Sequence, residues 1–214
     1  EMVSQLLQTD EQVTALARNS TRARHLQELL LQYPARLRVL EADVTKDLDI
    51  DRAVKMLDGQ CVDILINNAG VYQKADGPLK AMDPGIIEYT FNVNALAPMR
   101  VTKAFLPVLL KSKHPTVANI TSLMGSIEDN SSGGAYGYRM SKAGLDMFSR
   151  TLSLGFPNLI VLSLHPGWVK TDMGGDQAPT ERRESVAGLL KIMKAAAPKD
   201  TGSFYNFKGD SLPW

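Results

Sequence analysis

Residues 119–142 read N-I-T-S-L-M-G-S-I-E-D-N-S-S-G-G-A-Y-G-Y-R-M-S-K, and this stretch decides how the rest of the chain is interpreted. It starts with the end of an apolar segment, 117–120, which is typical of a buried strand. A loop rich in Gly and Ser follows, and the chain then becomes a helix that carries Tyr138 and Lys142. Because residues four apart lie on one face of a helix, both head groups can meet one ligand, and Ser122 joins them from the strand end. The stretch therefore predicts a site for proton transfer.

Each of these three side chains has a separate chemical use. A phenol has an ordinary pKa near 10, and a nearby cation stabilises the phenolate, so we expect Lys142 to lower the pKa of Tyr138. Ser122 can donate a hydrogen bond to a carbonyl oxygen that gains negative charge. The Tyr-to-Lys spacing alone also fits a helix with an aromatic side chain and a solvated lysine, so the interpretation depends on the other motifs.

The pattern T-S-x-x-G-S followed by Y-x-Y-R-M-S-K resembles the short-chain dehydrogenase/reductase family, most closely its C-factor-like branch near the carbonyl reductases. The resemblance implies that Ser122 orients the substrate and that Tyr138 is the acid-base catalyst. It also implies that Lys142 assists the tyrosine and holds the nicotinamide ribose. Tyr136 competes for the catalytic role, but Met140 stands four residues after it, which favours Tyr138.

Strand and helix patterns alternate along the chain, which predicts an α/β fold: one Rossmann-type domain with a doubly wound parallel sheet. Strands are expected at 12–17, 37–42, 62–66, 117–120, 159–164 and 203–206. Helices are expected at 1–8, from a cap at Ser20 or Thr21 to 31, at 46–57, at 84–111 with an interruption near 92–98, after residue 136, and at 180–194. A loop is expected at Gly77 and Pro78. Ligands of such sheets bind beyond the carboxyl ends of the strands, where the candidate site residues fall.

Two strand ends carry motifs of the family's dinucleotide site. The segment N-N-A-G at 67–70 resembles the motif that supports the centre of the sheet and lines the adenine ribose. Its Asn side chains can also tie neighbouring strands together. Asp43 and Val44 resemble the D-V pair whose Asp hydrogen bonds to the adenine amino group. Without the resemblance, the first motif also fits an ordinary Asn-Gly turn and Asp43 also fits a helix cap.

Two further motifs complete the resemblance. Residues 166–171, P-G-W-V-K-T, resemble the family's P-G-x-V-x-T, whose backbone and Thr hydroxyl hold the nicotinamide amide. Asn94 matches the family's Asn in a kinked helix, which holds a water that links the Lys to solvent, although a polar residue that bends a helix near Pro98 fits as well. The cofactor-binding residues implied in this way are Arg18, Asp43, Val44, Asn67, Asn68, Ala69, Gly70, Tyr138, Lys142, Pro166, Gly167, Val169 and Thr171. The catalytic residues are Asn94, Ser122, Tyr138 and Lys142, and no metal site is among the candidates.

Arg18 bears on the choice of dinucleotide. An acidic side chain after the strand expected at 12–17 would bind the ribose hydroxyls of NAD. Arg instead forms charge-assisted bonds to the 2′-phosphate of NADP. The sequence has Arg18 and Asn19 and no acid at this point, so NADP is expected over NAD. A solvated surface arginine is the alternative.

Composition limits the classes of function. The 214 residues suffice for one domain, and 44% hydrophobic with 22% charged residues is typical of a globular chain whose apolar runs are too short to span a membrane. A net charge of +1 gives no basic stripe for nucleic acid, so we expect a small-molecule partner. The single cysteine, Cys61, fits a reducing, cytoplasmic location, and we expect it to be a core thiol.

The chain departs from the family at its beginning, because the glycine-rich fingerprint T-G-x-x-x-G-x-G and the strand before it do not precede the first helix. That strand lies in the middle of the family's sheet, so we expect two unpaired strand edges and a lack of the N–H groups that cradle the pyrophosphate. We expect residues before Glu1 of the intact protein to supply both. A naturally shortened form with impaired catalysis is the alternative.

The resemblance implies an NADP-dependent oxidoreductase that reduces a ketone or aldehyde to an alcohol, or catalyses the reverse. Two alternatives remain open: a noncatalytic dinucleotide-binding signalling or regulatory protein, and an inactive truncated variant that acts through dimerisation. Helices around 94–111 and 136–155 resemble those that pair between subunits in the family, so a homodimer is expected.

Overall fold

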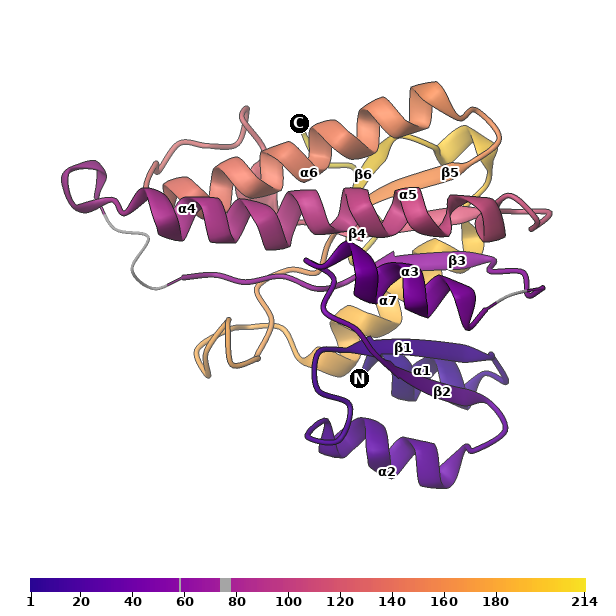
Figure 1. Cartoon of the computed structure of the whole chain (residues 1–214). Helices are drawn as coiled ribbons and strands as arrows, with labels where there is room; N and C mark the ends of the chain where they lie inside the picture. The colour runs from indigo at the N-terminus through magenta and orange to yellow at the C-terminus, as the bar shows by residue number, and fades with distance from the viewer. Residues whose placement is uncertain (58, 74–77) are drawn as a thin grey trace.

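The computed structural model describes residues 1–57, 59–73 and 78–214. Within these residues the strands all run parallel and form two sheets (Figure 1). The first sheet pairs β1 with β2, and the second has the order β3-β4-β5-β6. The strands are β1 (Val13–Ala17), β2 (Leu37–Glu41), β3 (Ile64–Asn67), β4 (Thr116–Ile120), β5 (Ile160–His165) and β6 (Ser203–Asn206). The predicted parallel α/β architecture is confirmed, although Gly77 of the expected loop lies outside the described residues.

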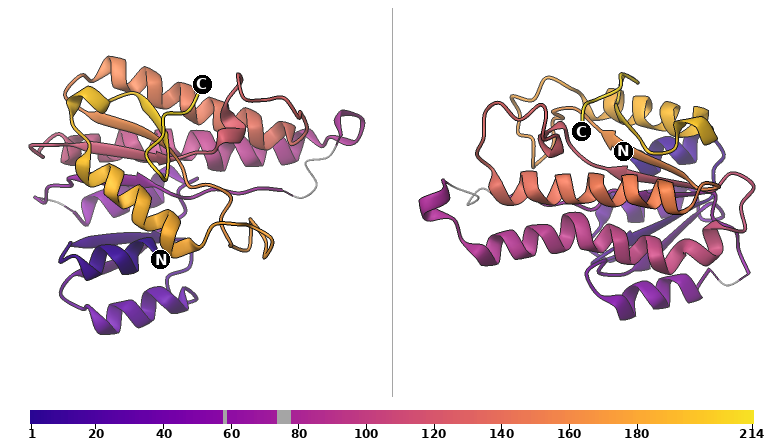
Figure 2. Two further views of the ribbon diagram at one scale, coloured as in Figure 1. Left: turned by 180° about the vertical axis from the view of Figure 1, so that it is seen from behind. Right: turned by 90° about the horizontal axis from the view of Figure 1, so that it is seen from above.

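Helices cover both faces of the strands, as a doubly wound fold requires (Figures 1 and 2). On one face, α3 (Asp47–Lys55) and α5 (Ala97–Leu109) bury Ile50, Phe105 and Leu109 against β3 and β4. On the other, α7 (Arg182–Ala195) buries Leu189 and Met193 against β4 and β5, and α1 (Met2–Gln8) packs against the same cluster. The remaining helices are α2 (Arg24–Gln32), α4 (Pro84–Phe91) and α6 (Tyr136–Gly155).

The strand register aligns the residues at the carboxyl ends of the second sheet. Asn67 pairs with Asn119 across β3 and β4, and Ile120 pairs with Leu164 across β4 and β5. No ladder joins β1 to β3 among the described residues, so each has one edge without a strand partner. The sequence analysis expected two such edges.

The long helical segment from 84 to 109 is interrupted by one local feature. Asp83 caps α4 by accepting a hydrogen bond from the backbone N–H of Gly85 at 2.8 Å, and Pro84 occupies the first turn. The π-helical turn η2 (Asn92–Leu96) then joins α4 to α5. The predicted interruption is therefore a π-helical turn, a feature that often marks functional sites.

Two local predictions are wrong. The helix expected to begin at Ser20 or Thr21 begins at Arg24, and its N-cap Ala23 makes no side-chain cap. Ser20 instead bonds to the carboxylate of Glu41 through both its N–H and its hydroxyl, each at 3.1 Å. Cys61, expected in the core, is exposed because it lies before β3 begins.

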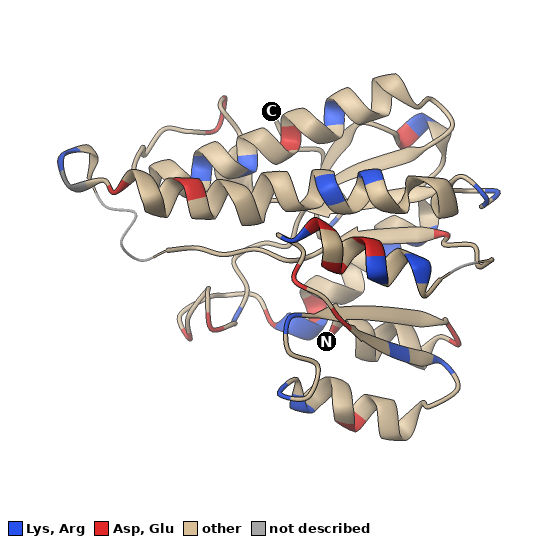
Figure 3. Ribbon diagram, viewed as in Figure 1, with Lys and Arg blue, Asp and Glu red and all other residues tan. Residues whose placement is uncertain are grey.

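The surface carries both signs of charge. Basic and acidic side chains are interspersed on α3, for example, where Asp47 and Asp49 in the first turn are followed by Arg52 and Lys55 in the last (Figure 3). Within the described ranges, each helix is too short or too polar to traverse a lipid bilayer.

Candidate active site

Ser122 lies just beyond the carboxyl end of β4. The strand ends at Ile120, and Ser122 then precedes a short 3-10 turn, η3 (Leu123–Gly125). The Ser122 hydroxyl oxygen accepts a hydrogen bond from the backbone N–H of Met124 at 3.2 Å, which fixes the side chain. Ser122 is buried, so a ligand that meets its hydroxyl meets it largely without water.

Tyr138 lies in the first turn of α6, with its phenol close enough to the Ser122 hydroxyl for that hydroxyl to lower the Tyr138 pKa. The helix begins after three successive residues with positive φ, Gly133, Gly134 and Ala135, which turn the chain sharply. Tyr136, the competing candidate, is exposed, whereas Tyr138 is partly buried. The structure therefore brings Tyr138 rather than Tyr136 to Ser122.

Arg139 anchors the loop that enters this helix. Its guanidinium donates to the carbonyl oxygens of Met124 and Gly133 and to the hydroxyl of Ser132, at 3.3, 3.2 and 2.9 Å. Sequence reasoning did not single out this residue. Because it ties the turn after Ser122 to the start of α6, Arg139 helps to hold the serine and the tyrosine in one arrangement.

Lys142 lies one helical turn beyond Tyr138 and is 4% exposed. Its ammonium nitrogen donates to the carbonyl oxygen of Ile120 at 2.9 Å and lies 5.7 Å from the centre of the Tyr138 ring. A Cβ added to Gly70 would stand 3.6 Å from the same nitrogen. The Lys142 ammonium thus lies where the first turns of α6 approach the ends of β3 and β4.

The electrostatics of the tyrosine differ from the expectation. Burial raises the pKa of Tyr138, the nearby Ser122 hydroxyl lowers it, and Tyr72 and Asp146 raise it. Burial also lowers the pKa of Lys142 to about 8, against the opposing charge of Asp146. The pKa of Tyr138 is therefore raised and not lowered as expected, because burial of the phenol has the largest effect and the Lys142 ammonium bonds to the carbonyl oxygen of Ile120.

Asn94 lies in the π-helical turn and is fully buried. Its side-chain oxygen accepts from the N–H of Val71 at 2.8 Å, and its nitrogen donates to the carbonyl of Val71 at 2.9 Å and to the Ser141 hydroxyl at 3.0 Å. The side chain thus joins the segment after β3 to α6 beside Lys142. The expected water relay through Asn94 remains a prediction.

Tyr72 is a residue of the site that the sequence analysis missed. Its ring meets that of Tyr138 edge to face at 5.1 Å between centroids, and 40% of its surface is exposed. The sequence feature that could have identified Tyr72 is its position as an aromatic residue two positions after the N-A-G motif. Asn94 clamps its neighbour Val71, so Tyr72 is presented to the site from a fixed backbone.

The N-N-A-G residues divide into two groups. The Asn67 amide is buried and donates to the side chains of Asn119 at 2.7 Å and Thr102 at 3.1 Å, so it ties β3 to β4 and α5. Asn68 and Ala69 are exposed beyond the strand end, and Gly70 lies next to Lys142 and Asn94. The expected strand-tying role of this motif is confirmed for Asn67.

Arg18 and Asp43 lie together at the ends of β1 and β2, since Ala17 pairs with Glu41 and the Arg18 charge acts on Asp43. Hydrogen bonds from Thr45 hold the pKa of the Asp43 carboxyl below its usual value. Val44 packs partly against the core. Arg18 and Asp43 thus stand together, and Asp43 is engaged by Thr45; their expected contacts with the dinucleotide stay predictions.

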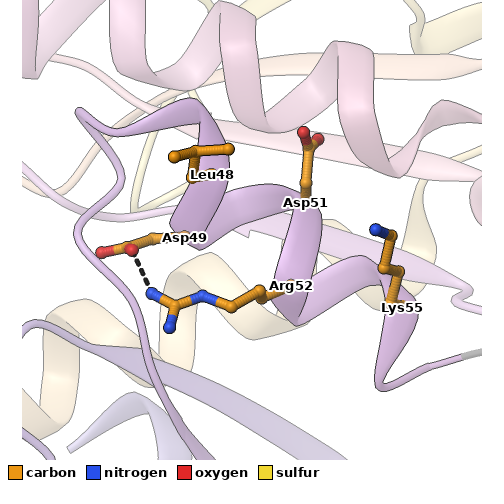
Figure 4. Close-up of a pocket in the computed structure, with 5 residues that line it drawn as sticks. All are labelled: Leu48, Asp49, Asp51, Arg52 and Lys55. Atoms are coloured by element: carbon orange, nitrogen blue, oxygen red, sulfur yellow. Dashed lines mark hydrogen bonds and ion pairs between the residues drawn. The ribbon is translucent and has the colours of Figure 1, made fainter.

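A hollow on the outer side of α3 adjoins this corner (Figure 4). Its lining residues come from one helix, and Asp49 and Arg52 form an ion pair within it. The Asp49 carboxylate also accepts from the backbone N–H of Asp43 at 3.0 Å. The hollow contains none of the candidate site residues and is lined by Leu48, Asp49, Asp51, Arg52 and Lys55.

The segment after β5 folds on itself. Gly167 has φ +83°, and an added Cβ would lie 2.8 Å from the Phe207 ring, so glycine is required there. The Pro166 carbonyl accepts from the Ser185 hydroxyl at 2.6 Å, and Val169 bridges to Thr180. The Thr171 hydroxyl accepts from the N–H of Gly174 at 3.0 Å. These bonds hold the predicted nicotinamide segment at the carboxyl edge of the sheet.

In the part of the chain that the structure describes, no group of three His, Cys, Asp or Glu side chains could hold a metal ion.

A family model described as short chain dehydrogenase matches residues 1–182. The chain belongs to the short-chain dehydrogenase family.

Individual relatives agree with this assignment. C-signal of Myxococcus xanthus is 44% identical over 155 residues, which cover 72% of this chain and 93% of that protein. The NADPH-bound carbonyl reductase from chicken fatty liver superposes with a TM-score of 0.91 at 33% identity, over 99% of this chain and 92% of that one. The carbonyl reductase Sniffer of D. melanogaster superposes with a TM-score of 0.91 at 30% identity, over 95% of this chain and 88% of that one. This short-chain dehydrogenase is thus similar to the branch that the sequence motifs indicated.

Proposed function

We propose that this short-chain dehydrogenase reduces a ketone or aldehyde to an alcohol with NADPH, or catalyses the reverse reaction. The observation that carries the proposal is that the Ser122 hydroxyl and the buried ammonium of Lys142 both lie beside the phenol of Tyr138. A hydroxyl, a phenol and an ammonium in a largely buried site suit proton transfer to an oxygen that gains charge.

The residues present fit a dinucleotide. Gly70 leaves room beside Asn94 and Lys142, where a side chain would stand 3.5 to 3.6 Å from their polar atoms. At the other end of the site, the guanidinium of Arg18 suits a 2′-phosphate and favours NADP over NAD. The solved carbonyl reductases from chicken and from Pseudomonas aeruginosa PAO1 contain NADPH and NADP, respectively, which supports the same choice.

The chain's own residues would handle the proton and the charge on oxygen. When bound, the reduced nicotinamide supplies hydride to the carbonyl carbon. Ser122 donates a hydrogen bond to the substrate oxygen, and Tyr138 gives that oxygen its proton. Lys142 would hold the nicotinamide ribose and bring a positive charge near the phenol, whose pKa burial nevertheless keeps above its usual value. Asn68, Ala69, Gly70, Pro166, Gly167, Val169 and Thr171 would line the dinucleotide, with Asp43 and Val44 at the adenine.

The test is turnover with a panel of ketones and aldehydes. We expect the protein to consume NADPH in a carbonyl-dependent manner and NADH more slowly. Arg18→Ala should weaken the preference for NADPH, whereas Arg139→Lys should leave it unchanged because Arg139 lies at the other end of the site. A folded protein that binds NADPH and converts no carbonyl would disprove the proposal.

A second function is favoured by one comparison, the similarity to C-signal of Myxococcus xanthus. In this second function, the present chain would bind a dinucleotide and act in signalling, without turnover on the same scaffold. Tyr138→Phe separates the two functions, because a signalling protein should tolerate the loss of the phenol hydroxyl and a reductase should not.

We also propose that the protein acts in the cytoplasm as a homodimer on a small-molecule substrate. The outer faces of α5 and α6 expose Met99, Met147 and Leu154, which are apolar side chains that a second copy would cover. Sedimentation analysis tests the dimer, and a concentration-independent monomer would contradict it.

A further inference from the structure

Asp146 is a buried acid that the proposed mechanism does not use. It lies one turn beyond Lys142, so that Tyr138, Lys142 and Asp146 follow one another along the inner face of α6. Its residue is 4% exposed, and neither carboxylate oxygen has a partner in hydrogen-bond geometry among the described residues. A buried carboxylate without such a partner is costly, so its presence calls for a function.

The surroundings of this carboxyl connect it to the proposed reaction site. The turn that follows Ser122 lies against it, because a Cβ at Gly125 would stand 2.6 Å from its Oδ2 atom and 2.9 Å from the backbone carbon of Lys142. The hydroxyls of Thr121 and Ser163 stand close enough to lower the pKa of the carboxyl, although their geometry is not that of hydrogen bonds. Only glycine at position 125 leaves room for the acid in this place.

We propose that Asp146 is a positioning residue whose negative charge, two turns along α6 from the phenol, acts directly on Tyr138 and opposes the loss of its proton. The inference rests on the proposed function, since it concerns the proton that Tyr138 transfers. Lys142 is the charged group that acts on Asp146 among the described residues. The phenol of Tyr138 also lies on α6, while the turn η3 contributes Gly125. The two uncharged hydroxyls come from the end of β4 and from within β5.

The signs of the electrostatic effects follow from the charges. Burial raises the pKa of Asp146 to about 7, and Lys142 and the two hydroxyls lower it. An ionised Asp146 favours the ammonium form of Lys142 and disfavours the phenolate of Tyr138, so it raises both pKa values. Removal of the negative charge should lower both. Carbonyl reduction needs the protonated phenol, so its alkaline limit should move to lower pH.

The variant Asp146→Asn tests this, because it keeps the shape of the side chain and removes the charge. NMR titration of protein with labelled lysine should show a lower pKa for Lys142 in the variant than in the wild type. The alkaline limb of the pH profile of kcat/KM for carbonyl reduction should shift in the same direction. An unchanged or raised Lys142 pKa, or an unmoved limb, would overturn the inference.

Ser149→Ala is the matched control. Ser149 is a buried polar residue of α6 that binds Asn119 at 2.8 Å and carries no charge. Its loss should reduce stability and leave the Lys142 pKa and the pH profile where they are. A purely structural function of Asp146 would give Asp146→Asn the same behaviour as this control.

Two measurements keep the test independent of folding and of turnover. If Asp146→Asn does not fold, titration of labelled aspartate in the wild type decides: a pKa near 7 supports the inference, and one near the ordinary 3.8 overturns it. If the folded wild type converts no carbonyl, the proposed function fails. The Lys142 titration and the phenolate absorbance of Tyr138, taken as a difference from Tyr138→Phe, still decide the effect of Asp146.

Discussion

The Ser122 hydroxyl at the end of β4 lies close enough to the phenol of Tyr138, in the first turn of α6, to lower the pKa of that phenol. We expect Ser122→Ala to lower kcat for carbonyl reduction by about 10²–10³-fold, the usual effect of removing one donor to a developing oxyanion. Ser126→Ala is the control, because its hydroxyl accepts from Asp129 outside the catalytic pair. Steady-state kinetics measures the effect, and a wild-type kcat in Ser122→Ala would exclude the assigned function of this hydroxyl.

Asn94 is expected to contribute mainly to stability through its bonds to Val71 and Ser141. Asn94→Ala leaves the buried backbone groups of Val71 without their partner, so the free energy of unfolding should fall by about 1–3 kcal/mol. Asn92→Ala, which removes a partly buried bond from Arg100, should cost less. Denaturant unfolding compares the two variants, and equal losses would show that the clamp on Val71 has no special importance.

The close approach of η3 to α6 makes Gly125 intolerant of a side chain. Gly125→Ala would place a Cβ 2.6 Å from the Asp146 carboxylate and 2.9 Å from the Lys142 backbone, so we expect a loss of about 1–3 kcal/mol. An added Cβ at Gly155, at the end of α6, meets nothing within 4 Å, and Gly155→Ala should be neutral or slightly stabilising. Comparable unfolding free energies for both variants would contradict the packing described.

Asp146 also predicts how stability depends on pH. Its folded-state pKa, about 7, lies above the ordinary 3.8, so its stabilising contribution is complete below about pH 4 and is lost as the pH rises through 7. The stability of wild type relative to Asp146→Asn should fall across this window, by about 1.4 kcal/mol per unit of pKa difference. Burial lowers the pKa of His165 to about 4, so His165 changes stability with pH in the opposite direction. Because both proteins contain His165, its contribution cancels in the difference between them. A constant difference between the two proteins would contradict the raised pKa.

Most of the fold could be predicted from the sequence because local signals are strong in a parallel sheet. Runs such as 117–120 are buried throughout and mostly apolar, since both faces of their strands are covered, and Asp83 with Pro84 marks a helix start directly. The start of α2 could not be predicted, because Ser20 is engaged by Glu41 from a distant strand rather than by its own helix. Cap propensity contains no information on such a long-range partner.

The site shows the same division. The spacing of Tyr138 and Lys142 predicts that both face one side of α6, and the structure places Ser122 against the phenol. The direction of the Tyr138 pKa could not be predicted, because it depends on how deeply the ring is buried and on Tyr72 and Asp146. Sequence spacing gives neighbours on one helix but not the desolvation of a side chain or the residues that other elements bring to it.

The central claim is that Tyr138 transfers the proton, and turnover of Tyr138→Phe measures it most directly. With NADPH and a carbonyl that the wild type reduces, we expect kcat/KM of the variant to fall by about 10²–10⁴-fold. The rise in melting temperature caused by NADPH should remain, because the phenol hydroxyl is not needed for folding. A Tyr138→Phe protein that reduces the carbonyl at the wild-type rate would contradict the account.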